Sequence, residues 1–225
     1  MIRYTNNQEQ SNRIIELYMF VNPLGTRCLK AEEHALKLIE SHKGKFHFRV
    51  IAFHNLQTVA NYMKALNIDA SKQPEISQNL YQACLAFKAA ELQGKKNGRN
   101  FLITLQRDVV LNKKTFCYDL LVEVAKQTGI DVEMFLTDLH SDLVQKAFES
   151  DQKIAREMCV EKNPSAVFFD TDDTNYGILI DDCLTPDILE KVYQEIITPE
   201  HQVKRLTSST HLPAARRIKH YLRSL

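Results

Sequence analysis

Residues 14–28 read IIELYMFVNPLGTRC, which joins an apolar run to a proline turn and the beginning of a helix. The run at 14–21 is short and rich in Ile, Tyr, Phe and Val, so it predicts a buried strand. Apolar side chains then recur at helical spacing through residues 27–42, and a glycine follows as a stop signal. Residues 45–53, KFHFRVIAF, predict a second strand. This order predicts a βαβ unit with parallel strands and a right-handed crossover.

The middle of the chain changes character, because residues 58–158 carry almost no strand signal. Apolar residues recur there every three or four positions, which predicts a series of helices. Asp131 is expected to cap the N-terminus of one of them, and Gly94 and Gly129 fit helix C-termini. The predicted helices span residues 59–66, 76–93, 98–109, 118–127, 131–139 and 141–158.

Strand signals return late, as SAVFFD at 165–170 and YGILI at 176–180. The polar turn TDDTN between them predicts a β-hairpin. Pro186 then opens a last amphipathic helix. The order βαβ, helices, ββα is typical of an α/β, thioredoxin-like fold of the DsbA type. Such a fold has a mixed sheet and a large all-helical insertion.

This order also predicts the domain organisation. Residues 14–57 and 159–198 are expected to form the thioredoxin-like domain. Residues 58–158 form an inserted helical domain over the end of the sheet where the first helix begins. Residues 1–13 are expected to be a flexible N-terminus, and residues 199–225 a basic C-terminal tail or helix.

The tail beyond Glu200 contains no acidic residue. Apolar residues at helical spacing near its end predict a short basic amphipathic helix from Pro213 onward. Two interpretations stay open: a solvated or docked helix, or a contact with a partner or an acidic surface. The basic residues concerned are Lys204, Arg205, Arg216, Arg217, Lys219 and Arg223.

The overall charge provides no attraction to nucleic acid or anionic membrane, since 29 basic residues balance 28 acidic ones and the formal net charge is +1. No apolar run approaches the roughly 18 residues that span a bilayer, and residues 1–12 hold no signal-peptide core. We therefore expect a cytoplasmic protein. The cysteines lack metal-ligand spacing, so we expect free thiols, no metal and no cofactor. They are Cys28, Cys84, Cys117, Cys159 and Cys183.

Folds of this type begin the first helix with Cys-x-x-Cys, where the helix N-terminus stabilises the attacking thiolate. The corresponding residues here are Gly25, Thr26, Arg27 and Cys28. Gly25 has no side chain, so the nucleophile is missing and a two-thiol cycle is excluded. Cys28 keeps the position of the resolving thiol. We interpret it as a packing residue, with a monothiol redox sensor as the alternative.

Asn163 and Pro164 stand directly before the strand that begins at Ser165, where thioredoxin folds place a cis-proline facing the first helix. We predict a cis peptide bond there. Proline removes an amide and holds the strand start open, so an extended peptide could pair with this edge. Asn163, Pro164 and Ser165 are therefore a candidate peptide-docking edge.

Four segments resemble the DsbA-like adaptors of Firmicutes called YjbH or SpxH. The resemblance runs through roughly residues 14–197, in matching order and spacing. It implies an adaptor that binds the transcriptional regulator Spx and promotes its degradation by the ClpXP protease. Members of this family carry Cys-x-x-Cys where this chain begins the motif with glycine, and the family's adaptor function is expected not to need thiol chemistry. The segments are IELYMFVNPLGTRC, ACLAFKAAELQGKKNG, LTDLHSD and KIAREMCVEKNPSAVFFD.

The expected function is thus a non-catalytic adaptor, with Spx as its client and ClpX or ClpXP as a further candidate partner. Nucleic acid and membranes are not expected partners. Two alternatives stay open. One is a monothiol or glutathione-dependent thioredoxin-fold enzyme, such as a kappa-type transferase or an isomerase-like protein, in which Thr26 would be the residue to test. The other is a chaperone-like or scaffolding module for other clients.

Overall fold

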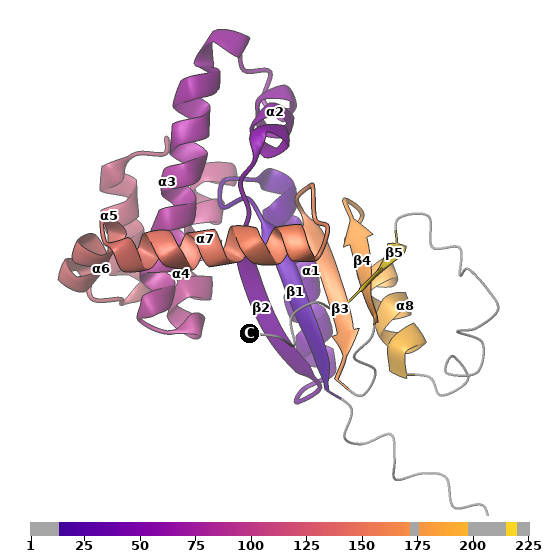
Figure 1. The fold of residues 1–225 in the computed structure, drawn as a ribbon. Coiled ribbons are helices and arrows are strands. Elements are labelled where there is room, and N and C mark those ends of the chain that lie inside the picture. Colours follow the sequence, from indigo (N-terminus) through magenta and orange to yellow (C-terminus); the bar gives the residue numbers. More distant parts are fainter. Residues whose placement is uncertain (1–13, 172–175, 198–214, 220–225) are drawn as a thin grey trace, which may run out of the picture.

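The first part of the chain forms a parallel strand pair bridged by a helix. The computed structural model describes residues 14–171, 176–197 and 215–219 (Figure 1). Its first elements are β1 (Ile15–Val21), α1 (Thr26–Ser41) and β2 (Phe46–Ala52). The two strands pair in parallel along their whole length. This arrangement confirms the predicted βαβ unit.

The segment between β2 and β3 is helical, as predicted. Three of its helices, α2, α3 and α4, begin three residues earlier than the apolar pattern predicts, and in α2 a capping side chain sets the start. The side chain of Asn55 accepts a hydrogen bond from Thr58 N at the start of α2. Asp131 caps α6 as predicted, by accepting from Met134 N. The elements are α2 (Leu56–Ala65), the 3₁₀ turn η2 (Ala70–Lys72), α3 (Gln73–Leu92), α4 (Lys95–Val110), α5 (Tyr118–Thr128), α6 (Val132–Leu139) and α7 (Asp142–Glu157).

The last part of the chain completes a five-stranded mixed sheet in the order β2-β1-β3-β4-β5. β3 pairs antiparallel with both β1 and β4, which explains why all six of its residues are buried. Among the helices of the described part of the chain, none is both long and apolar enough to cross a membrane. The remaining elements are β3 (Ser165–Asp170), β4 (Tyr176–Asp181), α8 (Pro186–Ile197) and β5 (Ala215–Lys219).

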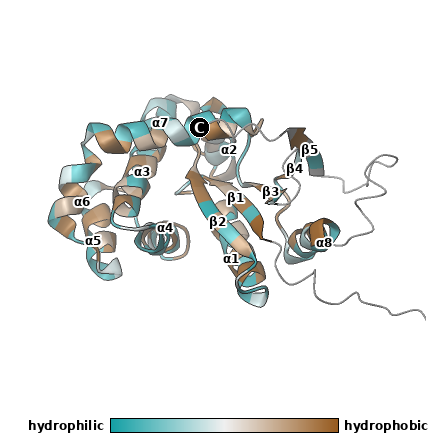
Figure 2. Ribbon diagram, turned by 60° about the horizontal axis from the view of Figure 1, so that its bottom comes forward, coloured by the Kyte–Doolittle hydropathy of each residue, from teal (hydrophilic) through white to brown (hydrophobic). Residues whose placement is uncertain are grey.

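Helices cover both faces of the sheet. Figure 2 shows α1 and α8 against one face, α7 across the other, and the block α3–α6 beside the sheet. Alternate residues of β1 serve the two faces, since Met19 packs in the large core with α1, α8 and the inserted helices, whereas Phe20 packs under α7 with Ile154 and Met158. The DsbA-type α/β layout, with a helical insertion, is therefore present.

The C-terminal prediction is wrong for residues 215–219, which form the edge strand β5 rather than a helix. β5 pairs antiparallel with β4, with Arg217 opposite Ile178. An unpaired β4 edge offers backbone hydrogen bonds to any extended segment, and Ile218 is buried in the apolar cluster that also contains Ile154 of α7. Arg216 Nη2 donates to Cys159 O at 2.6 Å. Lys204, Arg205 and Arg223 lie outside the described part of the chain, as do residues 1–13 and the turn at 172–175.

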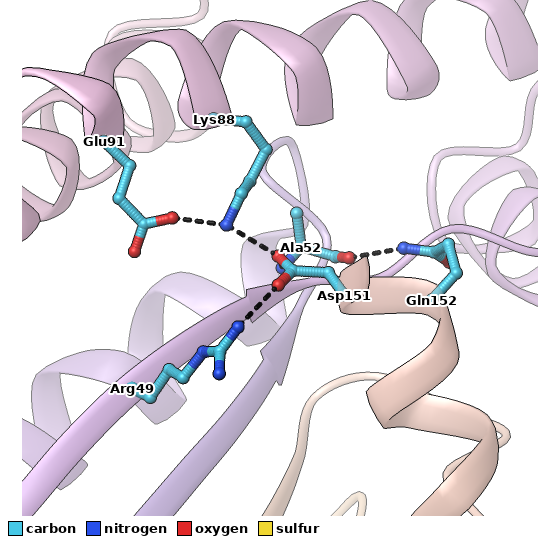
Figure 3. A network of polar contacts seen from close by, with 6 residues as sticks. All are labelled: Arg49, Ala52, Lys88, Glu91, Asp151 and Gln152. Carbon is cyan, nitrogen blue, oxygen red and sulfur yellow. Dashed lines mark hydrogen bonds and ion pairs between the residues drawn. The ribbon is translucent and has the colours of Figure 1, made fainter. Parts of the chain in front are cut away.

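At the opposite edge of the sheet, side chains of α7 form hydrogen bonds with the backbone at the end of β2 (Figure 3). Ala52 N donates to Asp151 Oδ2 at 3.1 Å, and Gln152 Nε2 donates to Ala52 O at 2.7 Å. Gln152 Oε1 also accepts from His54 N. Two neighbouring side chains of one helix thus satisfy backbone groups at the end of an edge strand, which fixes α7 against the sheet.

A buried ion-pair network surrounds the same carboxylate. Asp151 is completely buried, and its Oδ2 lies 3.0 Å from the Nζ of Lys88, a side chain that is itself 6% exposed on α3. Lys88 also pairs with Glu91, and Arg49 of β2 approaches Asp151 Oδ1 at 3.4 Å. Figure 3 shows Lys88 reaching from α3 to Asp151 on α7. The network therefore connects the insertion to the sheet.

Candidate functional site

The four residues at the former redox position lie at the start of α1. Gly25 is the N-cap residue, and its backbone is extended, with φ −82° and ψ 121°. Thr26 and Arg27 are exposed in the first turn, whereas Cys28 is buried. The helix has no side-chain cap and no acidic residue in its first turn. The positive end of its dipole is thus uncompensated from within the helix.

The Cys28 thiol points into the protein and is held there. Its Sγ accepts a hydrogen bond from Asn22 N at 3.2 Å, and the side chain is 1% exposed. Burial raises the pKa of the thiol, because a thiolate would be desolvated. A neutral, enclosed sulfur is a poor nucleophile. The packing interpretation of Cys28 is therefore favoured over the monothiol sensor.

Gly25 occupies a position where a side chain would approach the buried thiol. A β-carbon built there would lie 3.0 Å from Cys28 Sγ and 3.2 Å from Asn22 O. The first distance is close to the roughly 3 Å that separates a β-carbon from the partner sulfur across an S–S bond of about 2.04 Å. This distance is compatible with a disulfide between a cysteine at position 25 and Cys28.

Gly25→Cys is therefore expected to form an intramolecular disulfide with Cys28 on mild oxidation. The variant has six thiols, one more than the wild type's five, and oxidation should leave four free in denaturant. Thiol titration and the loss of two hydrogens in the intact mass measure this. Gly25→Ser, the control, should keep all five. Six free thiols after oxidation of Gly25→Cys would contradict the geometry described for the start of α1.

The Asn163–Pro164 peptide bond is cis, as predicted. At Pro164 and Ser165, however, the start of the strand is not an open edge. Ser165 pairs with Phe20 on one side and Asp181 on the other, since β3 lies inside the sheet. Pro164 and Ser165 are buried, and Ser165 Oγ donates to Asp181 Oδ1 at 2.7 Å. The order of strands, which the sequence alone left open, is the reason for this difference.

Of these three residues, only Asn163 is partly exposed, and its side chain connects the loop before β3 to the segment that leads into α2. Its Nδ2 donates to Phe53 O at 3.2 Å and to Thr58 Oγ1 at 3.1 Å. Asn55 Nδ2 donates in turn to Glu161 O at 3.1 Å. The start of α2 is thus fixed to the loop before β3. Neither the backbone N–H nor the C=O of Asn163 has a hydrogen-bond partner within the described residues.

A groove of about 620 Å³ lies between these segments. Figure 1 shows α2 beyond the end of the sheet where β1 ends. The groove is bordered by the start of α1, one face of α2, and the loops before β3 and after β4. Its volume falls in the range of about 300–1,000 Å³ that is typical of ligand sites. The lining residues used below are Thr26, Arg27, Gln57, Asn61, Tyr62, Lys64, Ala65, Leu66, Lys162, Asn163 and Asp182.

An ion pair closes one side of the groove. Arg27 Nη2 lies 2.6 Å from Asp182 Oδ1 and donates to Asp182 O at 2.8 Å. Asp182 has a φ of 72°, the left-handed region, which turns the chain back toward α1. The first turn of α1 is thus attached to the loop after β4. No local motif indicates this pair or the face of α2 that lines the groove, so neither could be predicted from the amino-acid sequence.

One turn beyond Cys28, α1 carries the buried carboxyl of Glu32, which is 2% exposed. Gln106 Nε2 on α4 donates to Glu32 Oε1 at 2.6 Å. Burial raises the pKa of Glu32 to about 8. Gln106 Oε1 is buried and finds no partner among the described residues. A protonated Glu32 carries a hydroxyl donor that a carboxylate lacks, and Gln106 Oε1 is an acceptor without a partner among the described residues.

The remaining thiols do not form a second site. Cys84 is buried in α3, whereas Cys117, Cys159 and Cys183 are exposed, and all five cysteines are free. Within residues 14–171, 176–197 and 215–219, no group of three or more His, Cys, Asp or Glu residues is placed to hold a metal ion. The chemistry available at the groove is therefore hydrogen bonding, charge and apolar contact.

Comparisons with known proteins agree with this fold. The chain resembles a putative protein disulfide isomerase from Nitrosomonas europaea, with a TM-score of 0.61 at 11% identity, covering 80% of this chain and 96% of that one. It resembles Pseudomonas aeruginosa DsbA with a TM-score of 0.59 at 14% identity, covering 85% and 86%. At these identities the likeness concerns the fold alone, and it confirms the DsbA type.

Sequence comparison defines the family. A family model described as Thioredoxin matches residues 18–191. The ClpXP adapter protein SpxH of Bacillus subtilis strain 168 is 34% identical over 205 residues, which cover 83% of this chain and 69% of the relative. SpxH of Bacillus licheniformis is 32% identical over 212 residues, with 83% and 68% covered. The chain therefore belongs to the SpxH family of DsbA-like, thioredoxin-fold proteins.

Proposed function

We propose that this chain is a cytoplasmic, non-catalytic adaptor that binds Spx and promotes its degradation by ClpXP. One observation carries the proposal: the groove at the redox position is open, while the position of the nucleophile is glycine and the remaining thiol is buried. The SpxH relatives are ClpXP adapter proteins by name, which supports the same role. The free thiols are in keeping with a reducing compartment.

The chemistry at the start of α1 supports binding without disulfide exchange. Exchange requires a thiolate that reaches a disulfide sulfur and a second thiol that resolves the mixed disulfide. Gly25 supplies no sulfur, and Cys28 Sγ is engaged by Asn22 N beneath the surface. A protein that docks in the groove therefore meets no reactive group from this motif and leaves unchanged.

The backbone beside the groove supports docking of an extended client segment. Asn163 lines the groove, and its backbone N–H and C=O have no hydrogen-bond partner among the described residues. An extended peptide satisfies such groups as a neighbouring strand does. The surrounding side chains of α2 then contact the client's side chains. Docking of this kind uses the geometry of a disulfide-exchange fold for recognition.

Two physical routes lead from binding to faster degradation. The adaptor can bind one conformer of the client more tightly, and the resulting shift is limited by the difference in affinity between conformers. It can also bind client and protease together, which raises their effective concentration. Both routes require a complex of this chain with Spx, so complex formation is the first thing to measure.

The adaptor role is tested by mixing the purified chain with Spx, first on a sizing column and then with ClpXP and ATP. We expect a complex with Spx and a saturable increase in the rate of Spx degradation. Degradation of an unrelated ClpXP substrate should not change. Absence of both a complex and an acceleration would contradict the adaptor role.

The glutathione-dependent enzyme stays as a second candidate, because Thr26 is exposed and borders the groove. In such an enzyme the Thr26 hydroxyl would hydrogen-bond the glutathione thiolate and lower its pKa. Conjugation of glutathione to a chlorodinitrobenzene substrate measures this activity, with Thr26→Ala as the test variant. Conjugation that disappears in Thr26→Ala would favour the enzyme over the adaptor.

A further inference from the structure

We propose that the groove receives an extended, acidic segment of the client protein, selected by Lys64 of α2 and Lys162 of the loop before β3. This inference rests on the proposed adaptor function and adds the chemistry of the partner. It concerns a face of α2, in the inserted helices, that the redox chemistry of the fold does not require.

The charges that line the groove are unbalanced. Four charged side chains border it, and two of them, Arg27 and Asp182, neutralise each other at 2.6 Å. Lys64 and Lys162 are exposed and make no ion pair within the described part of the chain. The whole chain has a formal net charge of only +1, so this excess is a local property. Two unpaired ammonium groups at a concave surface favour carboxylates.

The uncharged lining suits a peptide rather than an isolated anion. Tyr62, Ala65 and Leu66 give α2 an apolar strip, and the Leu66 side chain is left 48% exposed. Gln57 and Asn61 add amides on the same helix. An extended chain with alternating acidic and apolar side chains matches lysines, amides and apolar surface together. The volume of about 620 Å³ holds only a short segment of such a chain.

The walls of the groove are held in place before any partner arrives. Asn163 joins the loop before β3 to Phe53 and Thr58, and Asn55 joins α2 to Glu161. The Arg27–Asp182 pair holds the opposite side. Lys64 and Lys162 therefore project from segments that are bonded to each other. Such preorganisation reduces the ordering cost of binding.

The first experiment uses defined peptides and does not depend on Spx. Three fluorescein-labelled peptides share the pattern Gly-X-Leu-X-Val-X-Leu-Gly, where X is Glu, Gln or Lys, and binding is measured by fluorescence polarisation. We expect the Glu peptide to bind the wild type about two- to thirtyfold more tightly than the Gln peptide, because two exposed ion pairs contribute about 0.2–1 kcal/mol each. Lys64→Glu/Lys162→Glu should reverse this preference and favour the Lys peptide. Lys126→Glu, an exposed lysine of α5 outside the groove, should behave as wild type.

The second experiment repeats the binding measurement with Spx and the same variants. A loss of about tenfold or more in Lys64→Glu/Lys162→Glu, with Lys126→Glu unaffected, is the expected result. If the Glu peptide binds as expected but Spx binds neither the wild type nor any variant, the inference about the groove is supported and the adaptor function is contradicted. If Spx binds the double variant as tightly as the wild type, the adaptor function is supported but the groove is not the site that binds Spx.

Three results of the peptide experiment would overturn the inference: equal binding of all three peptides, no binding at millimolar concentration, or equally tight binding of free glutathione.

Discussion

Replacing Asp151 by alanine is expected to lower the free energy of unfolding by about 3–5 kcal/mol. The carboxylate is completely buried, and its removal leaves Lys88 without its partner at 3.0 Å and Ala52 N without an acceptor. Both groups then lose interactions that water cannot replace. Urea denaturation followed by circular dichroism measures the change.

A matched control and a compensating variant make this result specific to the network. Glu149→Ala alters an exposed carboxylate of the same helix, so it should change the free energy of unfolding by less than about 0.5 kcal/mol. Lys88→Met/Asp151→Asn removes both charges and keeps an acceptor for Ala52 N. It should be more stable than Asp151→Ala. Equal stability of Asp151→Ala and Glu149→Ala would show that the ion pairs do not hold α7 to the sheet.

Replacing Glu32 by glutamine is expected to remove a strong pH dependence of stability. The pKa of Glu32 is about 8 in the folded protein and about 4.3 in an unfolded chain. Between these values the folded protein binds the extra proton, so unfolding releases it and stability falls as pH rises. The loss is complete above pH 8. At about 1.4 kcal/mol per pH unit, it amounts to at most about 4–5 kcal/mol.

The comparison is made by urea denaturation at several pH values from 5 to 9. Glu32→Gln keeps the shape and the hydrogen bond to Gln106, so it should be the more stable protein at pH 9 by several kcal/mol. Glu33→Gln is the control, because it disturbs a half-exposed ion pair with Arg107 between the same two helices and leaves Glu32 in place. A wild-type stability that rises from pH 5 to pH 8 would contradict a neutral Glu32.

Local patterns in the sequence were sufficient for the strands and helices of the core. The apolar run at 14–21 and the helical spacing that follows it depend on neighbours close in the chain, and β1 and α1 lie where they predict. The cis bond before Pro164 was predictable from its place before a strand. The start of α1 was likewise predictable, because the fold type places the Cys-x-x-Cys position, residues 25–28 here, at the start of the first helix.

Contacts between segments that are distant in the sequence could not be predicted from these local patterns. Lys88 lies in the apolar run ACLAFKAA, and nothing near it indicates that Asp151 is its partner. The apolar spacing near the C-terminus predicts a helix where β5 lies, because the hydrogen bonds of β5 come from β4 and not from within the segment. The enclosure of Pro164 and Ser165 could not be predicted for a related reason, since their exposure depends on the strand order. The groove itself is assembled from four separate segments.

The most direct test of a binding function without thiol chemistry is the rate of Spx degradation by purified ClpXP, measured under full reduction with increasing amounts of this chain. An adaptor that works through its groove should accelerate degradation to a plateau, while the same preparation shows no turnover of a disulfide substrate such as insulin. A rate of Spx degradation that does not change as this chain is added, together with measurable disulfide turnover by the wild-type chain, would contradict a binding function without thiol chemistry.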